Sequence, residues 1–119
     1  MSTVEAALRE VLDSPGVVRA TLADAVTGLT YGAVGSGTAA GDGAEIAELA
    51  TLVSGRMHEA GAGGELESLV ITTARAHHVV QLVPRRGDAL VLAVVLDRAS
   101  TNLALAIRQV NDLAKAVLA

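Results

Sequence analysis

The 119-residue sequence contains no cysteine and only one aromatic residue, Tyr31. Without cysteine the chain has no disulfide framework, no thiol nucleophile and no thiolate metal site. Its net charge is −4, with the arginines scattered mostly singly. Nucleic-acid-binding proteins typically show basic patches and stacking aromatic side chains. The composition therefore argues against a nucleic-acid-binding function.

The sequence also lacks the features of secreted and membrane-spanning proteins. Residues 1–5 show no basic segment leading into an apolar one, so we expect no signal peptide. The longest apolar run covers residues 89–96, far short of the roughly 20 residues that a membrane span requires. We therefore expect a cytoplasmic protein.

Aliphatic side chains are what the sequence has in excess, since 51% of its residues are hydrophobic. Such a composition excludes a disordered chain, and the length predicts one domain over residues 1–119. A domain of this size has too little interior to hide that much apolar surface. The composition therefore predicts self-association, most simply as a homodimer.

Hydrophobic periodicity predicts three helices and five strands in the order α-β-β-α-β-β-β-α. The helices are expected to begin at the capping boxes Ser2–Glu5 and Asp42–Glu45 and near Thr101. The expected strands are residues 17–24, 29–34, 66–73, 77–83 and 89–96. The last of these is apolar on both faces, which requires layers on both sides of the sheet. We predict an α/β (α+β) domain with a single five-stranded antiparallel sheet and helices on both faces.

A glycine-rich segment, residues 32–43, lies between an expected strand and helix, the context of a dinucleotide-binding fingerprint. Its third glycine, Gly41, comes one residue late, and the preceding strand belongs to a hairpin instead of a parallel β-α-β unit. The only lysine, Lys115, lies in the last helix, so a phosphate-binding P-loop is absent as well. We interpret this segment as a connecting loop.

The remaining polar residues predict no active site. His77 and His78 are adjacent on a strand and should point to opposite faces, and His58 has no carboxylate at a ligand spacing. No nucleophile-elbow motif is present. Three aspartates flank strand ends, where such residues usually solvate turns: Asp24, Asp88 and Asp97. We therefore expect no catalytic residue, no metal and no cofactor.

The expected second helix has an apolar core stripe and two unlike flanks when its residues are placed at 100° intervals. The stripe consists of Ile46, Leu49, Ala50, Val53 and Met57. One flank carries mostly small residues: Ala47, Thr51, Ser54, Gly55 and His58. Small residues allow two helix backbones to approach closely, so we predict that this flank packs against a second copy. The alternative is that small residues are simply tolerated on a helix of an alanine-rich chain.

The other flank of that helix is acidic and carries one apolar residue out of place. Its residues are Glu45, Glu48, Leu52 and Glu59. A leucine ringed by carboxylates is typical of an apolar anchor inside a charged rim. We predict that these four residues bind a partner protein.

Several segments, in their order along the chain, resemble the Roadblock family, which includes a dynein light chain and bacterial regulators of Ras-like GTPases. These segments are residues 15–24 (PGVVRATLAD) with Thr27-Gly28, then Glu45-Ile46-Ala47, residues 92–97 (LAVVLD) and residues 102–106 (NLALA). The resemblance covers nearly the whole chain and implies a Roadblock/profilin-like fold.

The resemblance also implies a function. Roadblock domains are typically non-catalytic modules that form homodimers or heterodimers, with the sheet continued across the edge of the middle strand and the second helices packed together. That mode places further dimer contacts here at Glu67, Leu69, Ile71 and Thr73. The family implies a scaffold or regulator of a small Ras-like GTPase, and the actinobacterial members that the chain resembles often accompany a sensor kinase. The alternative is a small-molecule sensor with a similar sheet, for which the glycine-rich loop would be a lid.

Overall fold

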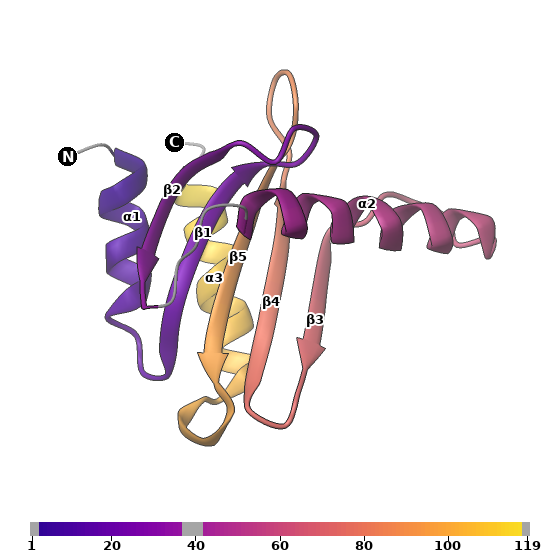
Figure 1. Ribbon diagram of the computed structural model, residues 1–119. Coiled ribbons are helices and arrows are strands. Elements are labelled where there is room, and N and C mark those ends of the chain that lie inside the picture. Colours follow the sequence, from indigo (N-terminus) through magenta and orange to yellow (C-terminus); the bar gives the residue numbers. More distant parts are fainter. Residues whose placement is uncertain (1–2, 37–41, 118–119) are drawn as a thin grey trace.

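The computed structural model describes residues 3–36 and 42–117 (Figure 1). Ser2 of the first expected capping box, residues 37–41 of the glycine-rich segment and the last two residues lie outside this part. The side chain of Asp42, in the second expected capping box, does so too. The predicted element order is confirmed.

The helices are α1 (Thr3–Leu12), α2 (Asp42–Glu59) and α3 (Leu103–Val117), with the 3-10 helix η1 (Arg98–Ser100) before the last. The strands are β1 (Val17–Asp24), β2 (Thr30–Gly35), β3 (Ser68–Thr72), β4 (Ala76–Val83) and β5 (Leu90–Asp97). Helix α3 begins later than Thr101 because the Asn102 side chain caps it, accepting a hydrogen bond from the backbone N–H of Leu105 (3.2 Å).

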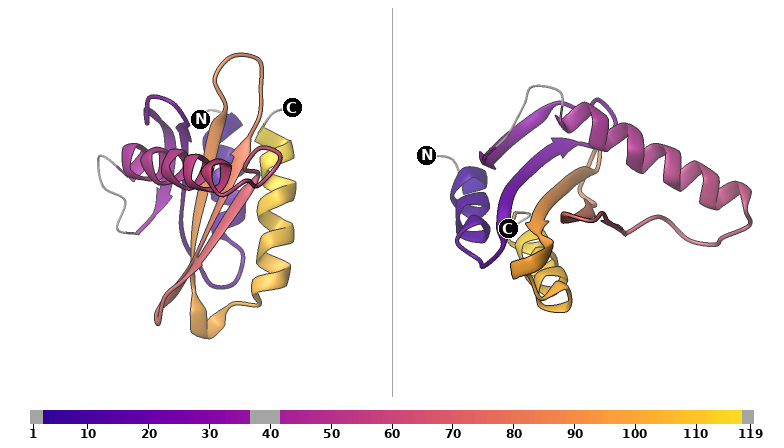
Figure 2. Two further views of the ribbon diagram at one scale, coloured as in Figure 1. Left: turned by 90° about the vertical axis from the view of Figure 1, so that its right-hand side faces the viewer. Right: turned by 60° about the horizontal axis from the view of Figure 1, so that its bottom comes forward.

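The five strands form one antiparallel sheet in the order β2-β1-β5-β4-β3 (Figure 1). Helices α1 and α3 pack together on one face, and α2 lies on the other (Figure 2). Strand β5 is central and its residues are buried from both sides, as its sequence predicts. The predicted fold class is confirmed.

The two faces of the sheet are unequally covered. The main core lies under α1 and α3 and is built from large side chains, among them Leu8, Leu22, Leu92 and Val110. The core under α2 is small and consists of Ala23, Val80, Val91 and Ala93, with Ile46 and Leu69 packed against it. Helix α2 therefore rests on a thin layer of short side chains.

The turn between β1 and β2 differs from its expected form at Asp24, which is buried. The carboxylate does not solvate the turn but accepts hydrogen bonds from the backbone N–H groups of Val26 and Thr27 (2.8 Å each). Asp97, half-buried at the end of β5, accepts a hydrogen bond from the Ser100 hydroxyl (2.5 Å). Buried polar groups need such partners, so these aspartates have structural roles.

Candidate protein-interaction surface

Helix α2 crosses the sheet and then continues past the edge strand β3 into solvent (Figure 1; Figure 2, right). Its buried residues, Gly43, Ala47 and Ala50, all lie in the first half, and every residue from Ser54 to Gly61 is exposed. In the described chain the segment before β3 runs beside the second half of this helix but buries none of these residues. This projecting half is the most conspicuous unpartnered element of the structure.

The expected core stripe of α2 is only partly correct. Ala50 is buried, but Ile46, Leu49 and Val53 are half-buried and Met57 is 50% exposed. The sheet beneath the helix presents alanine and valine side chains, so the helix backbone sits close and its small residues face inward. The larger apolar residues consequently lie along one side of the helix.

One residue of the small flank is buried, although the whole flank was predicted to contact a second copy. Ala47 is buried in the protomer, with 4% of its surface exposed, so it offers almost no surface to a second copy. The other four residues of that flank are exposed: Thr51, Ser54, Gly55 and His58.

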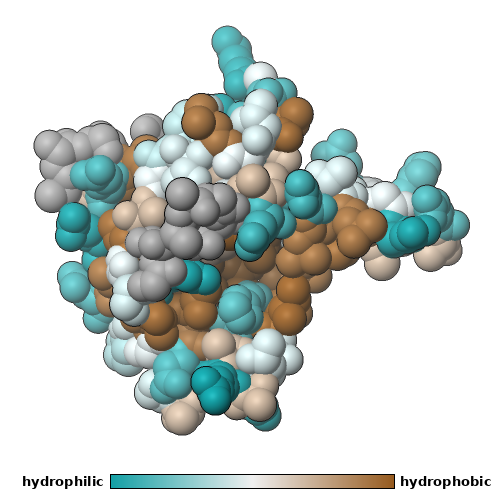
Figure 3. Space-filling model, in the orientation of Figure 1, coloured by the Kyte–Doolittle hydropathy of each residue, from teal (hydrophilic) through white to brown (hydrophobic). Residues whose placement is uncertain are grey.

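Each side of α2 borders its own groove on the sheet. The first, which we call the Ile71 groove, has a volume of about 310 Å³ and is bordered by Ile46 and Leu49 of the helix. Glu45 of α2 borders it as well. The lining from the sheet includes Ile71, His78, Val80, Ala93 and Val95. Apolar surface gathers along and below α2 on this face of the molecule (Figure 3).

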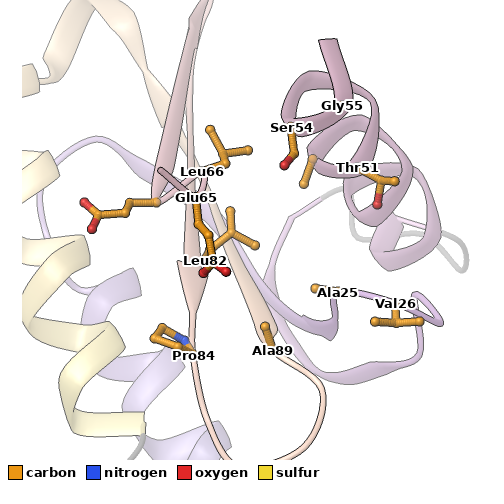
Figure 4. Close-up of a pocket in the computed structure, with 12 residues that line it drawn as sticks. Ala25, Val26, Thr51, Ser54, Gly55, Glu65, Leu66, Leu82, Pro84 and Ala89 are labelled. Atoms are coloured by element: carbon orange, nitrogen blue, oxygen red, sulfur yellow. The ribbon is translucent and has the colours of Figure 1, made fainter. Parts of the chain in front are cut away.

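The second groove, the Leu66 groove, has a volume of about 830 Å³ and lies on the other side of α2. Ser54 borders it from the helix, Leu82 from strand β4 and Leu66 from the segment before β3 (Figure 4). Thr51 and Gly55 lie on the same helix side as Ser54. The small flank of α2 therefore borders the larger of the two grooves.

The acidic flank lies on the solvent side of α2. Its four residues Glu45, Glu48, Leu52 and Glu59 are all exposed, and Leu52 is 57% exposed. Glu59 forms an ion pair with Arg56 (3.0 Å), which is exposed as well. Leu52 borders a further groove of about 440 Å³ whose opposite wall includes Val26, itself 72% exposed. Leu52 is thus outside the core, and its role in binding stays a prediction.

Strand β3 is an edge of the sheet, and the expected contact residues lie along it. Leu69 and Ile71 point to the α2 side, where Leu69 packs against the small core and Ile71 borders its groove. Glu67 and Thr73 flank the strand, and their backbones continue the pairing: Leu82 N–H donates to Glu67 O and Thr73 N–H to Ala76 O (2.9 Å each). An unpaired edge is a template for pairing with another strand.

Comparison with known proteins gives matches at the level of structure only. No family model matches the sequence, and no curated protein matches it significantly. The crystal structure of a Roadblock/LC7 domain from Streptomyces avermitilis superimposes with a TM-score of 0.75, covering 95% of this chain and 92% of that one at 19% identity. The chain has the Roadblock/LC7 fold.

Two further structures share this Roadblock fold. MglB from Myxococcus xanthus has a TM-score of 0.83 and 14% identity, with 98% of this chain and 85% of that one covered. An MglB structure described as having a tetrameric arrangement has a TM-score of 0.78 and 19% identity, with 95% and 83% covered.

The histidines of this Roadblock fold are placed as predicted, on opposite faces of β4. His77 is buried and its Nδ1 lies 2.7 Å from the Thr72 hydroxyl, whereas His78 borders the Ile71 groove. In residues 3–36 and 42–117 no three or more histidine, aspartate or glutamate side chains are grouped so that they could hold a metal ion. Within the same part of the chain, no helix is long and apolar enough to cross a membrane.

The sequence did not indicate which residues face α2 across the Leu66 groove and across the groove beside Leu52. Val26, in the β1–β2 turn, is far from α2 in sequence, and Leu66 lies in the connection between α2 and β3, yet both border grooves along α2. One available signal was the presence of an apolar valine in an otherwise small and polar turn. Nothing in the sequence pairs that valine with Leu52.

Proposed function

We propose that the protein is a non-catalytic homodimeric scaffold or regulator of a Ras-like small GTPase, formed by one domain over residues 1–119. The observation that carries this proposal is the Roadblock fold together with a second helix that projects, uncovered, beyond the edge of the sheet. The sequence resemblance to bacterial GTPase regulators supplies the partner class and, with it, the cytoplasm as the compartment. That resemblance alone supplies a third member of the complex, a sensor kinase.

The proposed dimer pairs the two β3 edges antiparallel, with contacts at Glu67, Leu69, Ile71 and Thr73. Two identical strands paired in this way are related by a two-fold axis perpendicular to the sheet, so the contact is isologous. Both α2 helices then lie on the same face of a continuous sheet, and each projects over the partner. This arrangement would cover the half of α2 that the protomer leaves exposed.

The same geometry indicates which side of α2 meets the partner helix. The axis brings the partner helix to the part of the sheet that α2 leaves open on its Ile71 side. The α2 residues that border this side are Glu45, Ile46 and Leu49, and Val53 continues the two apolar ones at helical spacing. We therefore favour this apolar flank for the helix contact, and keep Thr51, Ser54, Gly55 and His58 as the second candidate.

The GTPase is proposed to bind the solvent side of α2. There Leu52 offers an apolar anchor, and Glu45, Glu48 and Glu59 form an acidic rim around it. Such a rim attracts a basic surface on the partner and speeds association at low salt. No residue of this surface is proposed to take part in GTP hydrolysis.

A binding experiment with two purified proteins tests the proposed function. The chain is immobilised, and a Ras-like GTPase from the same organism is added after loading with GDP or with a non-hydrolysable GTP analogue. We expect retention of the GTPase, with a preference for one nucleotide state. Failure to retain the GTPase in either state would contradict the proposed function, whatever the oligomeric state of the chain.

A further inference from the structure

The Leu66 groove is roomy because the helix side of it is built from small residues. Thr51, Ser54 and Gly55 border it from α2, facing Leu66 and Leu82 (Figure 4). A Cβ atom added at Gly55 would meet no heavy atom within 4 Å. The space beside Gly55 is therefore open in the folded protomer.

This groove continues along α2 into the smaller one beside Leu52. Val26 and Thr51 border both grooves, which together follow the helix from Ala44 to Gly55. At 1.5 Å per residue this stretch is about 16 Å long, close to three helical turns. The joined groove thus has the length of a short α-helix.

The charged residues of the joined groove are all acidic. Glu48, Glu65 and Glu67 border it, and no lysine or arginine does. Most of the remaining surface is apolar and includes Leu82 and Pro84. An apolar channel bordered by carboxylates complements a helix that has one apolar face flanked by basic side chains.

We propose that a basic amphipathic α-helix of a partner protein binds in this joined groove, of which the Leu66 groove is the larger part. The inference deepens the proposed function and rests on it in one respect, namely that the GTPase supplies the helix. A second copy of the chain is a poorer occupant, because its own α2 carries Glu45, Glu48 and Glu59 and would bring like charges to Glu65 and Glu67. The helix side of the groove is opposite to the favoured dimer contact, and of its lining residues only Glu67 belongs to the proposed β3 contact, so the dimer leaves most of the groove accessible.

The test uses a synthetic helical peptide of about three turns, with leucine and alanine on one face and arginine flanking them. Its twin carries glutamate in place of arginine. Gly55→Trp fills the groove without changing the charge of the protein, and Gly55 has no positive φ that a side chain would strain. The matched control is Ala104→Trp, an exposed helical position on the opposite face of the sheet. Light scattering checks that both variants keep the oligomeric state of the wild type.

Fluorescence anisotropy should show the arginine peptide binding to the wild type and to Ala104→Trp, and at least tenfold more weakly to Gly55→Trp. The glutamate peptide should bind to none of them. Equal binding of the arginine peptide to wild type and Gly55→Trp, or of both peptides to the wild type, would overturn the proposal. A small molecule that raises the Tm of the wild type but not of Gly55→Trp, without any peptide binding, would assign the groove to ligand sensing instead.

The same variants used with the GTPase separate this inference from the proposed function. Loss of GTPase binding in Gly55→Trp, with binding by Ala104→Trp unaffected, supports both the proposed function and the groove as the binding site. A GTPase that binds wild type and Gly55→Trp equally leaves the proposed function standing and overturns the groove as its binding site. A wild type that binds the peptide but no GTPase overturns the proposed function and supports the groove as a helix-binding site.

Discussion

The Asp24 carboxylate accepts a hydrogen bond from the backbone N–H of Thr27 at 2.8 Å and closes the turn between β1 and β2. The turn brings Gly28 against the start of α2, where a Cβ at Gly28 would lie 2.5 Å from the Ala44 Cα atom. This contact helps to fix where α2 begins on the sheet, and hence which residues border the two grooves. Part of the sequence that resembles Roadblock proteins, Asp24 with Thr27-Gly28, therefore positions the interaction surface.

Asp24 should make the stability of the protein depend on pH in the acid range. The backbone N–H groups of Thr27 and Val26, in that order, lower the pKa of the Asp24 carboxyl below its ordinary value of 3.8. Because the folded-state pKa is lower than the unfolded one, the carboxylate stabilises the fold above the unfolded pKa, and this contribution is lost as pH falls through the folded pKa. We expect Asp24→Asn to reduce the fall in Tm below about pH 4. Thermal melts followed by circular dichroism at a series of pH values measure the Tm. A dependence of Tm on pH in Asp24→Asn parallel to that of the wild type would contradict the prediction.

Two glycines should respond in opposite directions to the same substitution. Gly28 has a φ of +76° and no room for a Cβ, so Gly28→Ala should destabilise the fold by at least about 1 kcal/mol. Gly55 is helical and borders open space, so Gly55→Ala should stabilise it by about 0.5–1 kcal/mol. Urea unfolding of both variants gives the comparison. A loss of stability at Gly55 would mean that the space beside it is occupied in the native assembly.

The core under α1 and α3 should provide most of the stability. Leu92 is fully buried in it, and Leu92→Ala should lower the free energy of unfolding by about 2–5 kcal/mol through lost burial and the cavity left behind. Leu105 of α3 is 53% exposed, so Leu105→Ala is the control and should change the free energy of unfolding little. Similar losses in the two variants would show that α3 is packed differently from the structure.

Strand β5 was predictable because its burial shows directly in its sequence. The segment that forms β5 is apolar at every position but its last. Such a pattern is typical of a strand whose two faces are both covered. Helix α2 was less predictable, since periodicity identifies an apolar side but not how far the helix stays on the sheet. Met57 fits the apolar stripe, yet it is 50% exposed.

The orientation of α2 depends on residues that its own sequence does not contain. Ala23 and Ala93 keep the layer beneath it thin, so the small Ala47 faces inward and the larger Leu49 lies to the side. The two grooves have the same origin, because each joins the helix to segments distant in sequence. Their positions therefore follow from the tertiary structure alone.

The flank of α2 used in the dimer can be decided by two arginine substitutions two residues apart. Val53→Arg places a charge on the apolar flank, where burial of an unpaired charge at a helix contact is costly. Gly55→Arg places the same charge on the small flank, beside open space. We expect a wild-type dimer of the 12.0-kDa chain, dissociation in Val53→Arg and an intact dimer in Gly55→Arg, measured by light scattering at micromolar concentration. The reverse pattern would return the contact to the small flank, and a monomeric wild type would contradict the dimer.

Leu52 should matter for binding but not for stability. Its side chain is 57% exposed, so Leu52→Ala should leave the Tm and the dimer unchanged while weakening GTPase binding by about 1–2 kcal/mol, an ordinary cost for losing one apolar anchor. Leu105→Ala removes a leucine of similar exposure from the opposite face of the sheet and should leave binding intact. Calorimetric titration with the nucleotide-loaded GTPase measures the affinity of both variants. Raising the salt concentration should slow association of the GTPase with the acidic rim. If Leu52→Ala instead lowers the Tm sharply and binds the GTPase normally, Leu52 is a packing residue and the proposed GTPase surface is wrong.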